Sequence, residues 1–268
     1  MNAEIRLLEE LPLNAHPALH TMFYDGWILR FADGYTNRAN SVNMLYPAQV
    51  PLDDKIDFCE SIYAKENLPA VFKITPLSAD VDVVLAERGY SVVTPTNLMV
   101  MDIGARLPAV LNSSTVSEGI SGAWQSDYFR LNQTNAKMIP AAKQMQGNIM
   151  PQTLTATLSI QNETAACGLC VIEQGCAGLY DIVVSPAFRR NGYGRDICTA
   201  LLNTATKYGA KKAYLQVVAE NTGAIVLYEK LGFKNLYQYW YRVKKQTKII
   251  FIKRSFPKSR PARFCRGA

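Results

Sequence analysis

The sequence predicts a mixed α and β fold made of two related halves, and three observations support this prediction. Strand-like and helix-like stretches alternate along the 268 residues. A content of 49% hydrophobic and 19% charged residues is ordinary for a globular protein, which excludes disordered, collagen-like and disulfide-scaffold classes. The same succession of elements is predicted twice: a strand, a helix, a Gly–aromatic pair and a final strand. The first copy runs from Val71 through Gly89–Tyr90, and the second runs from Leu215 through Gly232–Phe233.

The elements of the first half follow from apolar periodicity and from turn residues. Apolar side chains every three to four residues predict helices, and short runs of β-branched and aromatic residues predict strands. In chain order we expect a short helix at Pro17–Phe23, strands at Trp27–Phe31 and Ser41–Tyr46, a helix at Leu52–Glu66, a strand at Ala70–Thr75, a helix at Ala79–Arg88 and a strand at Asn97–Ile103. Small and polar residues from Gly104 to Gly122 predict a linker between two domains.

The second half shows the same alternation. We expect helices at Ala123–Asn132 and Pro140–Gln146, strands at Thr153–Ile160, Ala165–Glu173 and Leu179–Val184, a helix at Arg195–Tyr208, a strand at Ala213–Val218, a helix at Gly223–Leu231 and a strand at Tyr237–Val243. The apolar residues of the helix after Arg195 lie on one face, and Gly209 ends it. The predicted domains are residues 1–108 and 115–244, followed by a tail at 245–268.

The basic charge belongs to the end of the chain. Ten Lys or Arg residues and no acidic residue lie between Arg242 and Ala268, so the formal charge of +7 leaves a balance of −3 for the remaining 241 residues. Such a tail can contact nucleic acid or another anionic surface. A plain extension without that role is favoured, because Pro257 and Pro261 interrupt any helix there.

Composition also bears on location and on metal binding. No apolar run approaches the ~20 residues that a bilayer requires, and the acidic residues Glu4, Glu9 and Glu10 do not fit a secretory signal. We therefore expect a cytoplasmic protein without membrane insertion.

Cys167 and Cys170 form a CxxC on an expected strand, where residues three apart point to opposite faces. We expect free thiols and no metal site.

The most informative segment is a glycine-containing turn between the expected strand Leu179–Val184 and the helix that follows it. Gly192 and Gly194 permit positive φ and let a ligand approach the main chain. Successive main-chain N–H groups at a helix N-terminus form a site for anions, and a diphosphate fits it better than a monophosphate. The common phosphate loops GxxxxGK[ST] and GxGxxG are absent. The first half has no such turn, so only the second half is expected to hold an anionic ligand.

A second motif, AENTGAIVLYEKLGF, begins at Ala219, one expected strand after the turn. The two motifs together resemble the GNAT superfamily of acetyl-CoA-dependent N-acyltransferases over about residues 115–244. Arg189, Gly192 and Gly194 match the pyrophosphate signature of that family, which is Arg or Gln, two residues, Gly, one residue, then Gly or Ala. The residues that match its Asn, short helix, Tyr, Gly–Phe segment are Asn221, Tyr228, Gly232 and Phe233.

The resemblance implies two GNAT-like domains in tandem, the first degenerate, each with a mixed and mostly antiparallel sheet flanked by helices. It also implies two central strands that splay apart, with the pantetheine arm of acetyl-CoA held by one of them. The expected contacts to acetyl-CoA are Ile182, Val183, Val184, Arg189, Arg190, Asn191, Gly192, Tyr193, Gly194, Arg195 and Asn221. Asn221 also suits a helix N-cap, and both roles can hold.

Acetyl transfer needs an acid for the departing thiolate and a neutral amine. By its position in the motif Tyr228 is the expected acid, and its alternative is a core aromatic residue. The base stays open. Inward positions ahead of the turn hold Gly178 and Tyr180, and strand alternation places Asp181 on the face opposite Tyr180, while Glu173 also lies near. A water chain, or an amine that arrives deprotonated, is an equal alternative.

A polar run in the first half, WILRFADGYTNRANSV, is a candidate acceptor pocket between the halves. Its candidate substrate residues are Trp27, Arg38 and Asn40, joined by Tyr180 of the second half. The equal alternative is a solvated hairpin with Gly34 in its turn.

The predicted function is transfer of an acetyl group from acetyl-CoA directly to a primary amine of a small molecule or peptide. A longer acyl group or a hydroxyl acceptor would share every motif. The alternative of another class is a non-catalytic acyl-CoA-binding regulator or sensor, supported by the basic tail and by the open question of the base. The sequence names neither the acceptor nor the oligomeric state.

Overall fold

The computed structural model describes residues 2–104, 107, 109–112 and 114–244, so the predicted basic tail at 245–268 lies outside the described residues. Its α-helices are α1 (Asn2–Ala15), α2 (Leu52–Lys65), α3 (Ala79–Glu87), α4 (Gly122–Leu131), α5 (Ile139–Gly147), α6 (Tyr193–Lys207) and α7 (Thr222–Leu231). Its strands are β1 (His20–Tyr24), β2 (Trp27–Phe31), β3 (Val42–Met44), β4 (Val71–Ile74), β5 (Tyr90–Asp102), β6 (Thr115–Glu118), β7 (Gln152–Ile160), β8 (Glu163–Glu173), β9 (Cys176–Val184), β10 (Lys212–Val218) and β11 (Lys234–Lys244).

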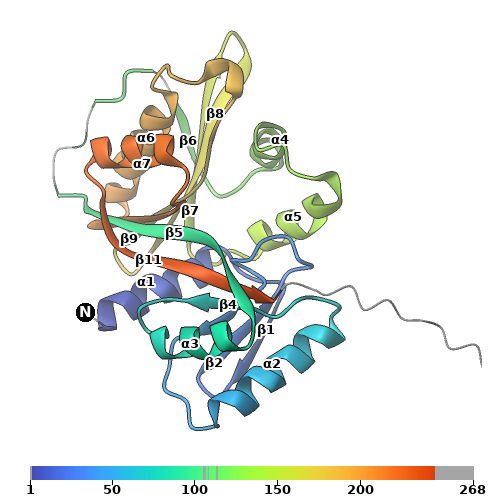
Figure 1. Ribbon diagram of the computed structural model, residues 1–268. Coiled ribbons are helices and arrows are strands. Elements are labelled where there is room, and N and C mark those ends of the chain that lie inside the picture. Colours follow the sequence, from blue (N-terminus) through green and yellow to red (C-terminus); the bar gives the residue numbers. More distant parts are fainter. Residues whose placement is uncertain (1, 105–106, 108, 113, 245–268) are drawn as a thin grey trace, which may run out of the picture.

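The strands form one mixed sheet in the order β1-β2-β3-β4-β11-β5-β10-β9-β8-β7-β6. Helices flank it: α6 and α7 lie together over one face of its upper part, α4 and α5 lie on the other side, and α2 and α3 lie beside its lower part (Figure 1). The predicted class, a mixed α and β fold with flanking helices, is confirmed.

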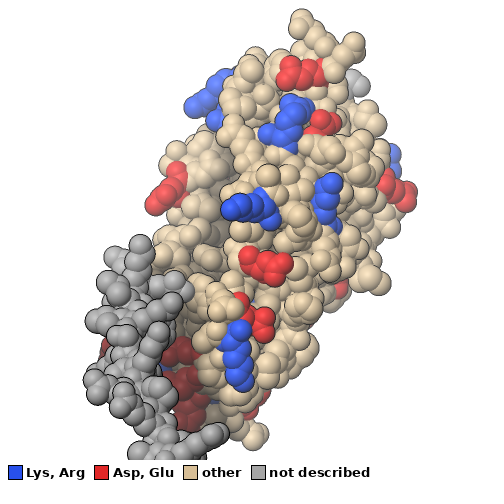
Figure 2. All heavy atoms as spheres, turned by 90° about the vertical axis from the view of Figure 1, so that its right-hand side faces the viewer, with Lys and Arg blue, Asp and Glu red and all other residues tan. Residues whose placement is uncertain are grey.

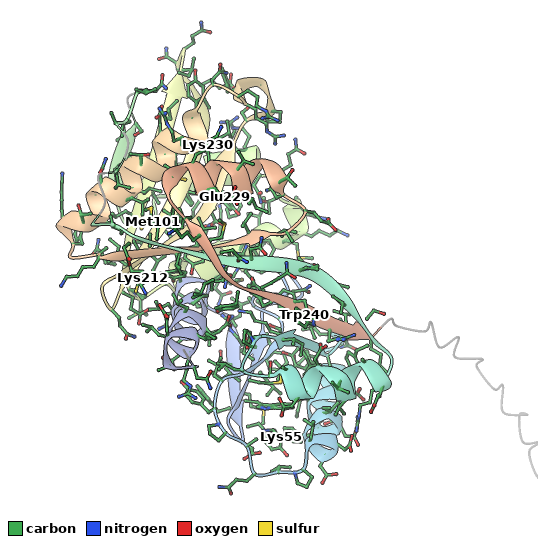
Figure 3. All side chains as sticks on the ribbon, turned by 60° about the vertical axis from the view of Figure 1, so that its left-hand side comes forward. Lys55, Met101, Lys212, Glu229, Lys230 and Trp240 are labelled. Carbon is green, nitrogen blue, oxygen red and sulfur yellow. The ribbon has the colours of Figure 1, made fainter. Side chains whose placement is uncertain are left out.

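The last strand of each predicted half is exchanged with the other half. β11 lies between β4 and β5, and β5 lies between β11 and β10, with antiparallel pairing at all three contacts. In Figure 3, Glu229 and Lys230 of α7 lie in the upper part of the molecule, whereas Trp240 of β11 lies in the lower part. There the Trp240 indole donates a hydrogen bond to Asp82 of α3 (2.8 Å). The two halves therefore share one sheet.

Two sequence-based expectations about local structure are wrong, and one helix was not predicted. The stretch predicted as a helix at Pro17–Phe23 contains strand β1, which forms an antiparallel hairpin with β2. Its two-residue turn, Asp25–Gly26, has positive φ at both positions (42° and 79°), as a turn matching the twist of the strands requires. The sequence analysis also missed helix α1, and it assigned β6, which pairs with β7 at the sheet edge, to the linker.

Two apolar clusters cover opposite faces of the sheet in the second half. Leu215, Val217 and Ile197 belong to the cluster beneath α6 and α7. Tyr214 and Tyr180 belong to the cluster beneath α1, α4 and α5. Cys170 lies in the first cluster and Cys167 in the second, so the predicted opposite facing of the CxxC pair is confirmed. A third cluster fills the first half between its strands and the helices α2 and α3.

A buried ion pair fixes α1 to the centre of the sheet. Glu9 of α1 pairs with Lys73 of β4, and both side chains are almost completely excluded from solvent. The Tyr237 hydroxyl donates to Glu9 (2.6 Å), and the Lys73 ammonium lies 4.0 Å from the centroid of the Tyr239 ring. Burial lowers the pKa of Lys73, and Glu9 opposes that shift. Three separate segments of chain thus meet at one charge pair.

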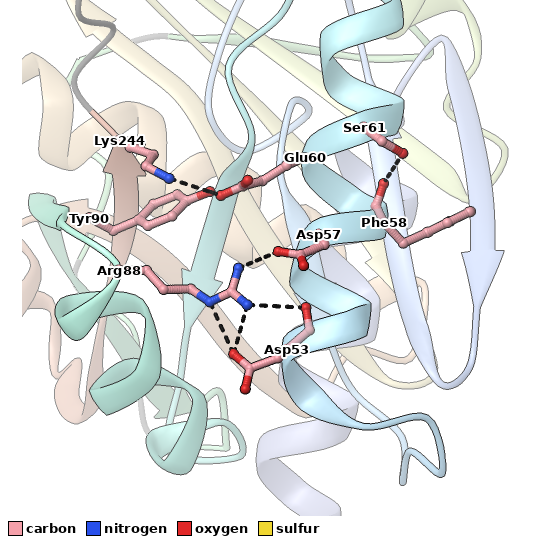
Figure 4. Close-up of polar contacts among 8 residues, drawn as sticks. All are labelled: Asp53, Asp57, Phe58, Glu60, Ser61, Arg88, Tyr90 and Lys244. Carbon is pink, nitrogen blue, oxygen red and sulfur yellow. Dashed lines mark hydrogen bonds and ion pairs between the residues drawn. The ribbon is translucent and has the colours of Figure 1, made fainter.

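Surface ion pairs join α2 to α3 and to the sheet (Figure 4). Arg88, at the end of α3, lies 2.7 Å from Asp53 and 2.5 Å from Asp57. The Tyr90 hydroxyl donates to Glu60 (2.6 Å), which also receives Lys244 at 3.4 Å. Such solvent-exposed pairs contribute at most about 1 kcal/mol each, so the apolar cluster beneath them dominates the stability of this half.

The surface carries mixed charge on the face that Figure 2 shows, where basic and acidic side chains are interspersed among uncharged ones. That face has no broad patch of one sign outside the grey atoms. Among the helices of the described residues, none has the length and apolar character that crossing a bilayer requires.

We predict that Glu9→Ala destabilises the protein by about 3–5 kcal/mol, because it leaves Lys73 buried without a counter-ion. The double variant Glu9→Leu/Lys73→Met should lose much less, since it removes both charges. Glu87→Ala, at an exposed site on α3, is the control. Denaturant unfolding measures all three, and a loss in Glu9→Ala no larger than in the control would contradict the prediction.

Candidate functional site

The site begins where the two central strands of the second half separate. β9 and β10 pair in parallel only from Cys176–Lys212 to Leu179–Leu215. Beyond that point β9 continues along β8 and β10 continues along β5. The splay that the resemblance implies is therefore present, and the separated strand ends beyond Leu179–Leu215 are called the opening below.

A β-bulge in β9 lies at this opening. Cys167 of β8 pairs with Val183 and Leu169 pairs with Tyr180, so β9 has one residue more than β8 between these pairs. Asp181 takes up the difference with a left-handed backbone (φ 52°). The expectation that Asp181 faces away from Tyr180 is wrong, because the extra residue breaks strand alternation and turns both side chains toward the same cluster.

Asp181 is held by two helices on that face. The Tyr128 hydroxyl of α4 donates to its Oδ1 (3.0 Å), and the Gln146 amide of α5 donates to its Oδ2 (3.2 Å). Burial raises the pKa of Asp181, opposed by the nearby Arg38 charge and by these hydrogen bonds. A carboxyl with a raised pKa beside an opening is suited to proton transfer near neutral pH.

The glycine-containing turn leads from β9 into α6. Gly192 is the N-cap of α6 with φ 81°, a conformation that favours glycine, and Arg190 is also left-handed (φ 68°). Gly194 lies in the first turn of the helix and does not have positive φ, so only Gly192 uses the conformation that both glycines permit. No described residue accepts a hydrogen bond from the main-chain N–H groups of residues 190–195. These groups are available to an anion.

The side chains of the turn fold back on its own main chain. The Arg189 guanidinium donates to the Val184 carbonyl (3.4 Å), and the Asn191 amide donates to the Phe188 carbonyl (3.2 Å). Tyr193 and Arg195 lie in the first turn of α6, where both are partly exposed. The predicted residues of the turn are thus brought together at one helix end.

Asp196 is a residue that the sequence analysis missed. It lies in the first turn of α6, fully buried, and accepts hydrogen bonds from Asn112 (Nδ2, 2.6 Å), from the Leu111 main chain (3.3 Å) and from Arg195 (3.1 Å). Burial alone would raise its pKa, but these hydrogen bonds hold the pKa below its usual value. The sequence could have indicated this residue, because an acidic side chain in the first turn of a helix interacts favourably with the helix dipole.

Tyr228 and Asn221 lie on α7, on the face that carries α6. The Asn221 side chain accepts from the Ala224 main chain (3.2 Å), so its N-cap role is present. Tyr228 is 8% exposed and packs edge-to-face on Phe233. Burial raises the pKa of Tyr228, and no described residue is hydrogen-bonded to its hydroxyl. The phenol therefore keeps its proton at neutral pH.

The residues proposed to hold the pantetheine arm line the separated part of β9. Ile182 and Val184 pack toward the cluster beneath α6, and Val183 packs toward the opposite cluster. Their strand is unpaired along its β10 side, because the β9–β10 ladder ends at Leu179. Within the part of the chain that the structure describes, main-chain groups on that side have no strand partner.

On the face opposite α6 and α7, a cavity of about 380 Å³ lies between the halves. Its walls come from the loop after β2 and from β5, β10 and β11: Gly34, Tyr35, Thr36, Asn37, Arg38, Thr94, Thr96, Gln216, Val218, Tyr239 and Tyr241. The sequence analysis missed Gln216 and Tyr241, because their approach to the first half depends on the strand exchange.

Of the four predicted substrate residues, only Arg38 lines this cavity. Trp27 is buried in the first half under the Lys55 ammonium, 4.1 Å from its ring centroid. Asn40 accepts from the Ala32 main chain (2.7 Å) and so shapes the loop rather than a pocket wall. Tyr180 is buried with its hydroxyl donated to Tyr214 (2.8 Å).

A family model described as "Probable histone acetyltransferase Rv0428c C-terminal" matches residues 2–242. The chain is a GNAT N-acetyltransferase of this family. The match spans both halves, so the first half is part of the family's architecture.

The names of similar proteins agree with the assignment of this chain to the N-acetyltransferases. The uncharacterised N-acetyltransferase YobR of Bacillus subtilis is 27% identical over 247 residues, covering 90% of this chain and 99% of YobR. The ribosomal protein bS18-alanine N-acetyltransferase of Escherichia coli is 42% identical over 57 residues, covering 21% of this chain and 38% of that enzyme. The non-catalytic regulator considered from the sequence is set aside, since these relatives are named as transferases.

Solved structures show the same fold. A GCN5-related N-acetyltransferase from Kribbella flavida superposes with a TM-score of 0.70 at 14% identity, covering 91% of this acetyltransferase and 96% of that chain. A tandem GNAT protein from the clavulanic acid biosynthesis pathway gives a TM-score of 0.64 at 11% identity, covering 88% and 86%.

Proposed function

We propose that this acetyltransferase moves the acetyl group of acetyl-CoA directly onto a primary amine. The observation that carries the proposal is the row of unpartnered main-chain N–H groups at the N-terminus of α6, beside the opening between β9 and β10. A helix N-terminus of this kind fits the pyrophosphate of coenzyme A. When bound, acetyl-CoA supplies an acyl group already activated as a thioester.

In this proposal donor and acceptor approach from opposite faces of the sheet. The turn, α6 and α7 lie on one face, and the cavity of Arg38, Gln216 and Tyr241 lies on the other. We propose that the reacting groups meet at the opening beyond Leu179–Leu215, where the pairing of β9 with β10 ends. Residues 115–244 then carry the catalytic groups, and residues 1–108 supply one wall of the acceptor cavity.

Tyr228 is the proposed acid. It lies on the donor face, its raised pKa keeps the phenol protonated, and its hydroxyl has no hydrogen-bond partner among the described residues. Such a group can give its proton to the thiolate as the C–S bond breaks. The edge-to-face contact with Phe233 fixes the ring.

Asp181 is the proposed base, which the sequence left open. The bulge turns its carboxylate to the acceptor face at the mouth of the opening, and the hydrogen bonds from Tyr128 and Gln146 fix its orientation. It would take the proton that the amine loses as the new C–N bond forms. The matching family model is named for a histone acetyltransferase and one relative for ribosomal-protein alanine, so protein amines are the acceptor class to be tested against small amines.

We predict that Tyr228→Phe lowers kcat by about 10²-fold or less, because the thiolate then leaves without an acid. The affinity for acetyl-CoA should not change, since the ring stays in place. Tyr208→Phe, at the exposed end of α6, serves as the matched control. Thiol release and calorimetry measure the two quantities, and an unchanged kcat with unchanged affinity would reject the role.

We predict that Asp181→Asn lowers kcat/KM by about 10²–10⁴-fold at neutral pH. Asn tolerates the left-handed backbone at this position, so the bulge should persist. In the wild type, kcat/KM rises with pH through the raised pKa of Asp181, because only the ionised carboxylate accepts the proton. In the variant the limb of Asp181 should vanish and only the limb of the acceptor amine, which shifts when an amine of different pKa is used, should remain. A limb that persists in the variant and does not shift with the amine would remove Asp181 from the mechanism.

A further inference from the structure

The acceptor cavity contains an arginine, Arg38, whose guanidinium has no direct ion-pair or hydrogen-bond partner among the described residues. Arg38 is half-buried in the cavity wall, and no described carboxylate lies within 4.0 Å of its guanidinium. No described residue accepts a hydrogen bond from its guanidinium either. Asp181 lies near enough to stabilise this charge without contacting it. An anion in the cavity would accept the charge-assisted hydrogen bonds that the Arg38 guanidinium lacks.

Arg30 provides a comparison from the same region. Its guanidinium is buried too, and it donates to the main-chain carbonyls of Leu13, His16 and Arg38. Arg30 thus has a structural role, in which its guanidinium makes three hydrogen bonds to main-chain carbonyls. Arg38 contributes only its carbonyl to that arrangement and keeps its own guanidinium for the cavity.

Two further residues of the cavity wall, Gln216 and Tyr241, carry polar atoms that are covered by protein and have no hydrogen-bond partner among the described residues. Both the nitrogen and the oxygen of the Gln216 amide are buried and unpaired among the described residues, as is the Tyr241 hydroxyl. Both residues line the cavity. Buried polar groups are almost always hydrogen-bonded, and a rotation of either side chain toward the cavity would let a ligand with donors and acceptors supply the missing partner.

We infer that the acceptor is a small free amino acid whose carboxylate pairs with Arg38 and whose amine faces Asp181, an inference that rests on the proposed function. The planar guanidinium offers paired donors that match a carboxylate. Tyr35 lines the cavity and also a smaller space that Asp181 borders. A cation at one end and an anion toward the other complement a zwitterion.

The size of the cavity supports a single amino acid. Its volume of about 380 Å³ is near the lower end for ligand sites, and the loop from Gly34 to Arg38 forms part of its wall. The N-terminus of a protein or peptide carries an amide where a free amino acid carries its carboxylate. Such acceptors would leave Arg38 unpaired. Free amino acids and peptide N-termini can therefore be distinguished by experiment.

The test measures thiol release from acetyl-CoA with the standard amino acids, and with the matching amino acid amides, decarboxylated amines and tripeptides. The free acids should be preferred by about 100-fold or more in kcat/KM, as expected for a desolvated charge pair. The Arg38→Gln variant should lose this preference, because kcat/KM should fall for the free amino acids and stay unchanged for the other acceptors. Arg88→Gln, on the far surface between α2 and α3, should keep it.

Several outcomes would overturn the inference. Amides, amines or tripeptides acetylated as well as the free acids would do so, as would Arg38→Gln lowering all acceptors equally. So would the absence of any acetylated amino acid, or of thermal stabilisation by one, in a protein that binds acetyl-CoA. The proposed function fails separately, if the protein neither binds acetyl-CoA nor releases thiol with any amine.

Discussion

The end of hydrogen bonding between β9 and β10 at Leu179–Leu215 is the constraint on which the site depends. A continuous ladder would seal the sheet between the helix face and the opposite face. The bulge at Asp181 accompanies the separation, since an extra residue bends and twists its strand. Opening the sheet and turning a carboxylate toward the acceptor face are thus two consequences of the same local geometry.

The exchange of β5 and β11 determines what faces that opening. Because β11 pairs with β4 and β5 pairs with β10, the loop that carries Arg38 is held beside Gln216 and Tyr241. The buried pair of Glu9 and Lys73 fixes α1 at the same junction. The first half has no anion-binding turn in the sequence, and its contribution is a wall of the acceptor cavity rather than a second donor site.

Local chemistry explains what the sequence could predict. The turn at Gly192 and the helix with Asn221 and Tyr228 are short-range features, so their structures agree with the expectation. The bulge was not predictable from alternation, because it depends on the register that β8 imposes on β9. The Gln216 and Tyr241 contacts depend on the strand exchange. The Asp25–Gly26 hairpin, by contrast, was predictable, because Asp-Gly is a typical two-residue turn between strands. Apolar periodicity alone favoured a helix before it.

The most direct measurement is a calorimetric comparison of acetyl-CoA with acetyl-pantetheine, which keeps the thioester and the arm but has no pyrophosphate. If the main-chain N–H groups around Gly192 bind the two phosphates, acetyl-CoA binds and the truncated thioester shows no measurable heat. That difference should shrink as salt concentration rises, since the contact is electrostatic. Equal affinity for both compounds, or no binding of either, would contradict the account.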